Sequence, residues 1–547
     1  MSRLVWLSFL FCLILPAQEV SQSGLKLAAA RPMIDQAERA PQAMAATVHE
    51  LATQAAIDIM KKGGNAVDAA VAVGFVLAVV HPEAGNLGGS GYMMVRTAGG
   101  QTVVFDYGVN YPKGAAPGMF QGSADRNVGH KAIGVPGTPA GMGAAHARFG
   151  KLKWRDVLEP ARKLAKEGFP ASQRLEIILK LQVPVMKRYP ETAKIFLHGT
   201  DQPLKQGEPV IQKDLAATIS RMQKKGWQEF YTGETARLIA TDIAAAGGVL
   251  SLEDLKTYQA RENPPLRISY RGYPILLNPP SSAGGTAVAV MLNTLEEFDL
   301  KLGMEGSSLA RHLQIEAMRI GFGARTRVAS GQPVEQVISK DYAQQAAKTI
   351  SLDRATPLNQ PLPSGFESFD TTHYTVADPY GNIVTNTYTL NGFFGSQVIP
   401  KGTGVLMNNY LNANMTNMKP GQRIYANMSP TIILRKDETP WAAFGTPGAM
   451  TIASTLAQIA VNLIDFRMSL RDAIEYPRIH YAGGNLGVDA EPGALVFDVA
   501  EKLRTMGHKL NPALRSQGDV NAIVIEEGTG WKQGWADGRR GGVVRGY

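Results

Sequence analysis

The stretch TTHYTVADPYGNIVTNTYTLNGFFGS, residues 371–396, decides how this part of the chain is expected to fold. Two alternating runs rich in β-branched residues, Thr372–Ala377 and Ile383–Leu390, flank the segment Asp378-Pro379-Tyr380-Gly381-Asn382. Alternation with a period of two indicates strands, and Asp, Pro, Gly and Asn are residues that turns prefer. The stretch therefore predicts a β-hairpin, with Thr371 at the start of its first strand.

Thr371 is a candidate nucleophile if the Asp370–Thr371 peptide bond is cut. A threonine hydroxyl is a weak nucleophile until a base lies beside it, and an N-terminal threonine brings its own base, the α-amine. That amine titrates at about 7.7–8.0, close to neutral pH. The Pro-rich segment Asp353–Glu367 before the bond is expected to be an exposed, flexible tail. A Thr-Thr pair by itself is far more often an ordinary feature of a strand than a catalytic one.

The 371–396 stretch resembles the start of the small subunit of the γ-glutamyltranspeptidases, a family of N-terminal-nucleophile hydrolases whose precursors cleave themselves before a threonine. The resemblance is collinear along nearly the whole chain. Other matching segments, in the family's order, are GGNAVDAAVA at 63–72, GNLGGSGY at 85–92, GVPG at 134–137, PPSSAGG at 279–285, MSPT at 428–431, TPG at 446–448 and ADGRR at 536–540.

The resemblance implies an α/β fold, the four-layer αββα sandwich of N-terminal-nucleophile hydrolases, whereas the residue pattern alone supports only a mixed α/β fold. It also implies a large subunit, residues 31–370, and a small subunit, residues 371–547, that form one heterodimer and one αββα unit. Residues 140–350 are mainly helical in pattern, with breaks expected near residues 170, 184, 264 and 279.

Residues 1–30 are typical of a secretory signal peptide. The apolar run Leu4–Leu15 is too short to span a bilayer comfortably, and cleavage is expected after Ala17 or after Ala30. Cys12 is the only cysteine, so the mature chain would contain none. Export without disulfides suits a periplasmic or secreted bacterial enzyme that is stabilised by its core.

The composition restricts the possible partners. With 547 residues, 44% of them hydrophobic, the chain can bury a large core. Its formal net charge is +9, but the basic residues are scattered and form no dense block with interleaved aromatics. Nucleic-acid binding is therefore not expected. The remaining apolar runs are too short for a stable membrane span.

The resemblance assigns further site residues. Thr389 matches the family's second threonine, whose hydroxyl lies near the nucleophile. Gly448 and Ala449 stand where the family has a Gly-Gly pair, and their backbone N–H groups would form an oxyanion hole. No metal or organic cofactor is expected. His312 and Glu316 share a helix face, but without further ligands at metal-binding spacing a packing or capping role is favoured.

The residues that would hold a γ-glutamyl group depart from the family's pattern. Gly108 replaces the arginine that binds the α-carboxylate, and Ala426-Asn427 replaces a Ser-Ser pair that helps to bind it. The residues that bind the α-ammonium fall at Tyr410 and Ala413, so only Asn391 remains of the usual set. Four other side chains are candidates to replace the missing contacts with a γ-glutamyl group. They are two cations, Lys113 and Arg423, and two neutral acceptors, Asn412 and Asn414.

The sequence thus predicts a self-processing amide hydrolase or acyltransferase that works through an acyl-enzyme. Its substrates would be small-molecule amides or peptides, of the γ-glutamyl (glutathione) type by family. Two alternatives stay open: an acylase of the same family acting on non-glutamyl amides, and a non-catalytic binding protein on this scaffold. The presence of Thr371, Thr389 and the Gly448 turn argues against the binding protein.

Overall fold

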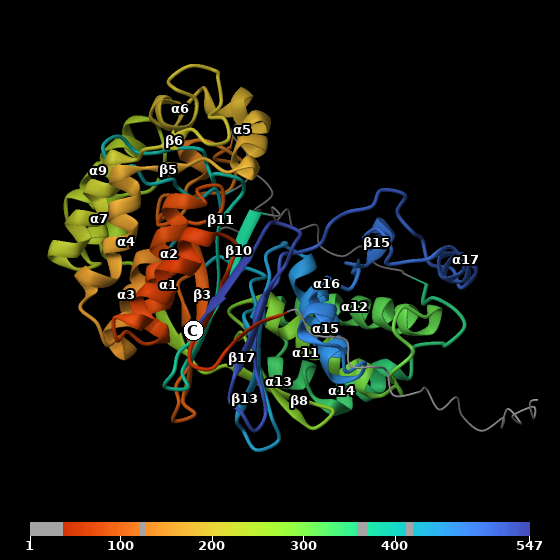
Figure 1. Ribbon diagram of the computed structural model, residues 1–547. Helices are drawn as coiled ribbons and strands as arrows, with labels where there is room; N and C mark the ends of the chain where they lie inside the picture. Colours follow the sequence, from red (N-terminus) through yellow and green to blue (C-terminus); the bar gives the residue numbers. More distant parts are fainter. Residues whose placement is uncertain (1–36, 121–126, 358–369, 412–418) are drawn as a thin grey trace, which may run out of the picture. The chain divides into compact units, whose positions relative to one another are not determined.

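The computed structural model describes residues 37–120, 127–357, 370–411 and 419–547 (Figure 1). The expected signal peptide with both of its cleavage points lies outside these residues. So do most of the expected tail and the positions Asn412, Ala413 and Asn414. In the described ranges no helix is both long and apolar enough to cross a membrane.

The predicted hairpin is present at the centre of a sheet. Strand β10 (Asp370–Ala377) pairs antiparallel with β11 (Ile383–Asn391). The Asp378 carboxylate organises the turn between them, because it accepts hydrogen bonds from the backbone N–H groups of Tyr380 and Asn382, each at 2.9 Å. It also accepts one from the N–H of Ala66, at 2.8 Å, and so ties the turn to the start of helix α2.

Two seven-stranded sheets, antiparallel throughout, contain most of the strands. The sheet with the hairpin has the order β18 (Val543–Gly546), β2 (Met44–Thr47), β10, β11, β3 (Ser90–Arg96), β4 (Thr102–Asp106) and β7 (Arg261–Asn263). The other has the order β1 (Glu38–Ala40), β17 (Lys532–Ala536), β16 (Asn521–Ile525), β13 (Pro440–Gly445), β12 (Thr431–Leu434), β9 (Tyr273–Leu277) and β8 (Leu266–Tyr270). Two-stranded sheets join β5 (Phe169–Pro170) to β6 (Pro209–Val210) and β14 (Ile479–His480) to β15 (Asp489–Ala490).

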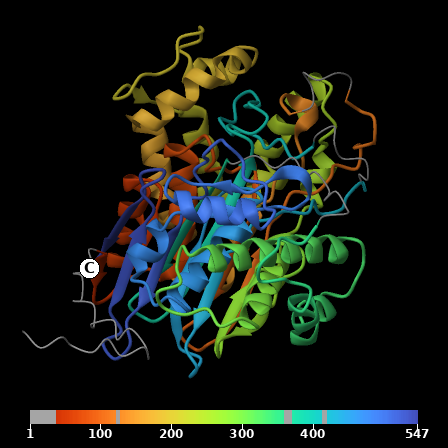
Figure 2. The same ribbon diagram turned by 90° about the vertical axis from the view of Figure 1, so that its right-hand side faces the viewer.

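Both large sheets combine strands from the two sides of the Asp370–Thr371 bond. β18, near the end of the chain, pairs with β2, near its beginning (Figure 2). The hairpin lies between β2 and β3. In the other sheet β12 pairs with β9, which lies more than 150 residues earlier. The proposed subunits would therefore share both sheets.

Helices cover the outer face of each sheet, so that the layers follow the order helix, sheet, sheet, helix (Figure 1). α2 (Ala66–Val80) packs on β10 and β11, β10 packs on β13 and β16, and α15 (Thr451–Ile464) packs on β13. α11 (Ala283–Glu296) covers β8 and β9, and α12 (Ser308–Ala329) packs on α11. This is the four-layer αββα sandwich that the resemblance implied.

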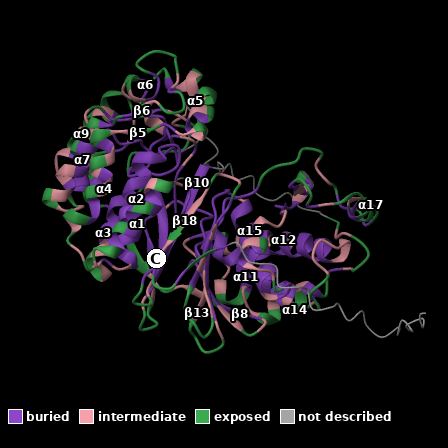
Figure 3. Cartoon of the chain, in the orientation of Figure 1, coloured by how far each residue is buried: buried purple, intermediate pink, exposed green. Residues whose placement is uncertain are grey.

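The other helices surround this framework: α1 (Glu50–Lys61), α3 (Thr138–Phe149), α4 (Trp154–Glu167), α5 (Gln173–Met186), α6 (Pro190–Phe196), α7 (Lys213–Lys225), α8 (Glu229–Thr232), α9 (Glu234–Ala245), α10 (Leu252–Lys256), α13 (Val334–Val337), α14 (Lys340–Ala347), α16 (Leu470–Glu475) and α17 (Phe497–Thr505). Burial is greatest in the strands and in the helices directly against them, such as α2 (Figure 3). Every residue of α2 is buried, as expected of a helix that is apolar all round.

One detail differs from the sequence pattern. Strands β7, β8 and β9, residues 261–277, interrupt the segment that is mainly helical in pattern. The break expected near residue 184 is confirmed, because α5 ends at Met186, although Pro184 itself lies in the last turn of the helix. A proline there removes one backbone hydrogen bond, but little helix follows for it to disrupt.

Candidate active site

A β-bulge lies at the Asp370–Thr371 bond. Asp370 faces Asn391 across the hairpin, whereas Thr371 faces Thr389, so Leu390 has no opposite residue. Bulges of this kind bend a strand locally and re-aim its side chains, and they are common next to active sites. Thr371 itself is 4% exposed. The candidate nucleophile is thus fixed at a local irregularity of an otherwise regular hairpin.

The Thr389 hydroxyl contacts the carbonyl group of the bond that is expected to be cut. Its Oγ1 donates a hydrogen bond to the carbonyl oxygen of Asp370 at 2.7 Å and accepts one from the N–H of Asn391 at 2.8 Å. Asn391 has a φ of 83°, in the left-handed region that asparagine tolerates better than most residues. A donor on this oxygen stabilises the negative charge that would develop when the carbonyl is attacked.

Arg540 contacts the backbone of Thr371, the candidate nucleophile. Its Nη1 donates to the carbonyl oxygen of Thr371 at 3.0 Å. Burial lowers the pKa of Arg540, and the nearby carboxylates of Asp519 and Asp370 oppose that effect. Arg540 belongs to ADGRR, one of the segments that resemble the family, but no role for it was expected from the sequence. The contact joins residues 169 positions apart, so only the folded structure reveals it.

Gly448 and Ala449 form the turn before helix α15. Gly448 has a φ of 132°, and a Cβ atom there would lie 2.3 Å from Thr451 Oγ1, so only glycine fits. Ala449 has a φ of 55°, a left-handed conformation that is unfavourable for alanine. Among the described residues neither backbone N–H has a hydrogen-bond acceptor. Both donors are therefore available near the helix N-terminus, where negative charge is favoured.

A small cavity brings the expected site residues together from distant segments. Its lining consists of Thr371, Thr389, Asn391, Tyr410, Ala426, Asn427, Met428, Ala449 and Ile452. Gly448 adjoins this lining through Ala449. None of these described lining residues carries a charged side chain. The cavity therefore combines a candidate nucleophile and a candidate oxyanion hole with a neutral wall.

Arg423 occupies the space beside Gly108, where the resemblance places an arginine in other family members. A Cβ atom at position 108 would lie 2.8 Å from Arg423 Cδ. However, the Arg423 guanidinium donates to the backbone carbonyls of Gly108 and Gln259 and lies 3.7 Å from Asp106. It does not line the cavity. These contacts indicate that Arg423 stabilises the local backbone.

Lys113, the other candidate for a displaced cation, lies on the surface. Its ammonium nitrogen is 4.0 Å from Glu253 Oε1, and both side chains are more than half exposed. An exposed pair of this kind contributes little to binding or stability. Lys113 does not line the cavity either.

His508 joins the pair His312 and Glu316 in the folded chain, which the sequence could not reveal. His312 Nδ1 lies 2.7 Å from His508 Nε2, and His312 Nε2 lies 2.7 Å from the carbonyl oxygen of Ser351. Glu316 accepts a hydrogen bond from Arg319 at 2.8 Å. Burial lowers the pKa of His508 to about 4, so it is neutral near pH 7. The structure thus supplies the further potential metal ligand that the sequence lacked, since ligand atoms of His312, Glu316 and His508 all lie within 4.8 Å of one another. The packing role of His312 and Glu316 stays a prediction.

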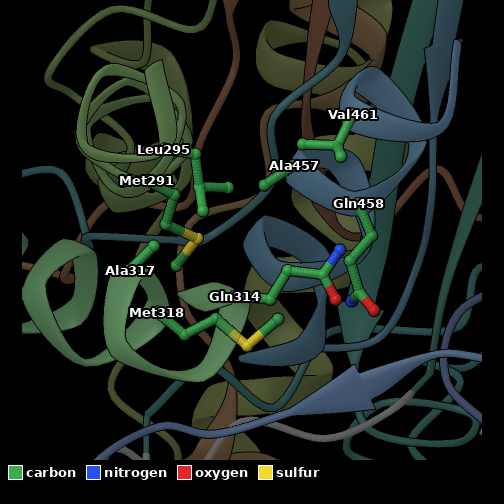
Figure 4. A pocket seen from close by; sticks show the side chains of 8 residues that line it. All are labelled: Met291, Leu295, Gln314, Ala317, Met318, Ala457, Gln458 and Val461. Carbon is green, nitrogen blue, oxygen red and sulfur yellow. The ribbon is translucent and has the colours of Figure 1, made fainter. Parts of the chain in front are cut away.

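A second cavity lies between α11, α12 and α15, away from the hairpin (Figure 4). Met291, Leu295 and Met318 point into it, and Gln314 and Gln458 lie at its polar edge (Figure 4). It contains neither a nucleophile nor an ionisable group among its lining residues. It is best described as a gap in helix packing, and the cavity at Thr371 remains the candidate active site.

The chain matches known proteins over most of its length. The family model described as Gamma-glutamyltranspeptidase matches residues 52–547. The chain is 36% identical over 473 residues to the glutathione hydrolase proenzyme of Escherichia coli (strain K12), covering 81% of each chain. It is 37% identical over 506 residues to the acylase ACY 1 proenzyme of Pseudomonas sp. (strain V22), covering 88% of this chain and 89% of that one.

A solved structure has the same architecture. The cephalosporin acylase from Bacillus halodurans superimposes with a TM-score of 0.84 at 27% identity, covering 95% of this chain and 98% of that one. The chain therefore belongs to the gamma-glutamyltranspeptidase family.

Proposed function

We propose that this chain is the precursor of an amide hydrolase or acyltransferase that cleaves itself between Asp370 and Thr371. The observation that carries the proposal is the bulge at this bond, where the Thr389 hydroxyl donates to the scissile carbonyl oxygen at 2.7 Å. Attack by the Thr371 hydroxyl on that carbonyl, followed by water, would release a carboxylate at Asp370 and a free α-amine at Thr371. Two similar proteins are named proenzymes, which also supports cleavage of a precursor.

In the mature enzyme the Thr371 hydroxyl attacks the carbonyl carbon of a substrate amide. The α-amine of Thr371 takes the hydroxyl proton and delivers it to the leaving amine. The N–H groups of Gly448 and Ala449 stabilise the oxyanion. Water then hydrolyses the acyl-enzyme, or a second amine accepts the acyl group. This cycle uses only residues of the chain and requires no metal or organic cofactor.

Two classes of acyl group are candidates for the substrate. Named relatives include both glutathione hydrolases and acylases. The neutral lining of the cavity, together with Gly108 and Tyr410 at positions that bind the γ-glutamyl group in the family, favours an acylase over a γ-glutamyl-specific enzyme. A γ-glutamyl hydrolase is the second candidate, supported by Asn391 in the cavity wall.

A panel of acyl-p-nitroanilides, with and without the γ-glutamyl group, tests the proposed function. Purified protein is expected to consist of two chains on a denaturing gel and to hydrolyse at least one class of amide. A single intact chain that binds amides without hydrolysing them would favour the non-catalytic binding protein instead.

Thr389→Ala is expected to slow both self-cleavage and turnover. The substitution removes the donor to the scissile carbonyl. A lost positioning or proton-transfer group lowers kcat by about ten-fold or more. Thr389→Ser keeps the hydroxyl and should retain most of the activity, while the thermal unfolding midpoint shows whether either variant folds normally. Wild-type cleavage and turnover in Thr389→Ala would mean that Thr389 is only a strand residue.

We also propose that the protein is exported to the periplasm or the medium. The signal-like N-terminus supports this, as does the absence of any cysteine after Cys12. Fractionation of expressing cells, with N-terminal sequencing of the exported large chain, should place the first residue after Ala17 or after Ala30. Retention of Met1 on cytosolic protein would contradict the proposal.

A further inference from the structure

Three side chains of metal-binding type meet where helix α12 packs on helix α17 (Figure 1). His312 and Glu316 lie one turn apart on α12, and His508 follows the end of α17. One ligand atom from each side chain lies within 4.8 Å of the other two. All three side chains are buried, and none is among the described residues that line the cavity at Thr371. The cluster is therefore separate from the candidate active site.

The hydrogen bonds of His312 determine which of its ring nitrogens can bind a metal ion. Its Nε2 lies 2.7 Å from the carbonyl oxygen of Ser351, which can only accept a hydrogen bond, so Nε2 carries the ring proton. In the neutral ring Nδ1 then keeps its lone pair, and it lies 2.7 Å from His508 Nε2. A metal-binding histidine almost always donates its other N–H to a carbonyl, a carboxylate or water. His312 thus has the hydrogen bonding of a metal ligand.

The Glu316 carboxylate is oriented by two donors that leave room for a metal ion. One of its oxygens accepts a hydrogen bond from Arg319 Nε at 2.8 Å, and the other accepts one from the N–H of Thr356 at 3.0 Å. These bonds use two of the roughly four lone-pair sites of an ionised carboxylate. Outer hydrogen bonds of this kind commonly hold a ligating carboxylate in place.

The donor set suits an ion of the zinc type. Imidazole nitrogens and carboxylate oxygens are common ligands of Zn²⁺, whereas Ca²⁺ and Mg²⁺ prefer oxygen ligands alone. In a tetrahedral site with bonds of about 2.0–2.2 Å, the ligand atoms lie about 3.3 Å apart. The separations here, 2.7 Å for the two imidazole nitrogens and up to 4.8 Å for the set, lie on both sides of that value. Small side-chain shifts would complete the site, with water as the fourth ligand.

Segments from both sides of the Asp370–Thr371 bond meet at this cluster. Residues 351–357, the last described residues before the expected tail, contact both ligands on α12 through the backbone of Ser351 and Thr356. The N–H of Ala355 also donates to the carbonyl oxygen of Met506, at 2.7 Å. The cluster therefore lies at an interface between the two proposed subunits.

We propose that His312, Glu316 and His508 bind one divalent ion of the zinc type, which fastens the small subunit to the large one. The first two ligands precede the Asp370–Thr371 bond and the third follows it, so the ion would join the two chains once the bond is cut. This joining role rests on the proposed function, whereas metal binding itself does not. When the ion binds, the proton on His508 Nε2 leaves to solvent and Nδ1 of that ring takes one up, so the neutral ring changes tautomer.

Zinc titration of untagged, processed protein tests the site. After dialysis against a chelator, wild-type protein should bind one Zn²⁺ per heterodimer in calorimetry, and Zn²⁺ should raise its thermal unfolding midpoint. Co²⁺ in place of Zn²⁺ should give the visible absorption that is typical of a four-coordinate site. His508→Gln and Glu316→Gln should each weaken Zn²⁺ binding by more than about a hundred-fold, because the loss of an outer-shell partner alone costs about 10- to 100-fold.

His198→Gln is the matched control, since His198 forms an exposed pair with Glu208 at 3.1 Å. This variant should bind Zn²⁺ as tightly as wild type does. The absence of Zn²⁺ binding by wild type would overturn the proposal without reference to any variant. Wild-type affinity in both His508→Gln and Glu316→Gln would overturn it as well, and the three side chains would then only pack.

Unfolding in urea tests the joining role. In the cut protein Zn²⁺ should slow the separation of the two chains, His508→Gln should lose this effect, and His198→Gln should keep it. An equal rate of separation by wild type with and without Zn²⁺ would overturn the joining role. If a denaturing gel shows one uncut chain, the proposed function fails, but the zinc titration still decides the metal site.

Discussion

Thr371→Ala is expected to remain a single chain on a denaturing gel, whereas the wild-type protein separates into two. The substitution removes the hydroxyl that would attack the Asp370 carbonyl, and no other nucleophile is expected to replace it. The smaller wild-type fragment should begin with TTHYTV when its N-terminus is sequenced. Amide hydrolysis should fall to the background rate in the variant, because neither the nucleophile nor its α-amine would form.

Thr372→Ala is the matched control for this result. Thr372 is the next residue of the same strand, it is 1% exposed, and its hydroxyl has no hydrogen-bond partner among the described residues. This variant should still be cut, and Thr371→Ser should be cut as well because it retains a hydroxyl. An intact wild-type chain, or fragments that begin elsewhere, would disprove cleavage at Asp370–Thr371.

γ-Glutamyl amides such as glutathione are expected to be poor substrates. The α-ammonium of the γ-glutamyl group would lose its partner, and a charge-assisted contact contributes about 1.5–3 kcal/mol. Burying that ammonium unpaired adds a further penalty, so that the total is roughly 3–6 kcal/mol. This corresponds to about a 10²- to 10⁴-fold reduction in kcat/KM. The measurement is kcat/KM for γ-glutamyl-p-nitroanilide against simple acyl-p-nitroanilides.

Gly108→Arg provides a second check on the same prediction. It should recover little γ-glutamyl activity, because the ammonium end would still lack an acidic partner. The new side chain would also meet Arg423, whose Cδ lies 2.8 Å from the position of the added Cβ. A strong γ-glutamyl preference in wild type, at the efficiency of an ordinary transpeptidase, would contradict the prediction.

The local parts of the fold follow from the sequence. Alternation and turn residues predict the hairpin of β10 and β11. At the start of α2, Asn65 and Asp68 form a capping box. These features depend on residues a few positions apart. The short strands β7–β9 were missed because three to five residues give too little periodicity to distinguish them within a helical segment.

The site was predictable only where the resemblance supplied positions. Six expected residues line one cavity: Thr371, Thr389, Asn391, Tyr410, Asn427 and Ala449. In contrast, the contacts of Arg540 with Thr371 and of Arg325 with Asn427 each join residues more than 100 positions apart. The bulge depends on strand register, which neither composition nor spacing reveals. Long-range contacts of this kind require the folded structure.

Because both large sheets contain strands of the two proposed subunits, cleavage would change how the enzyme refolds after heat or denaturant. Before the cut, one chain holds all strands at high effective concentration. Afterwards the same contacts join two chains, and once heat or denaturant separates them, reassembly becomes a bimolecular reaction that slows on dilution. The uncut Thr371→Ala chain would refold at a rate independent of concentration. The mature protein would instead depend on slow unfolding for its lifetime, which is kinetic rather than equilibrium stability.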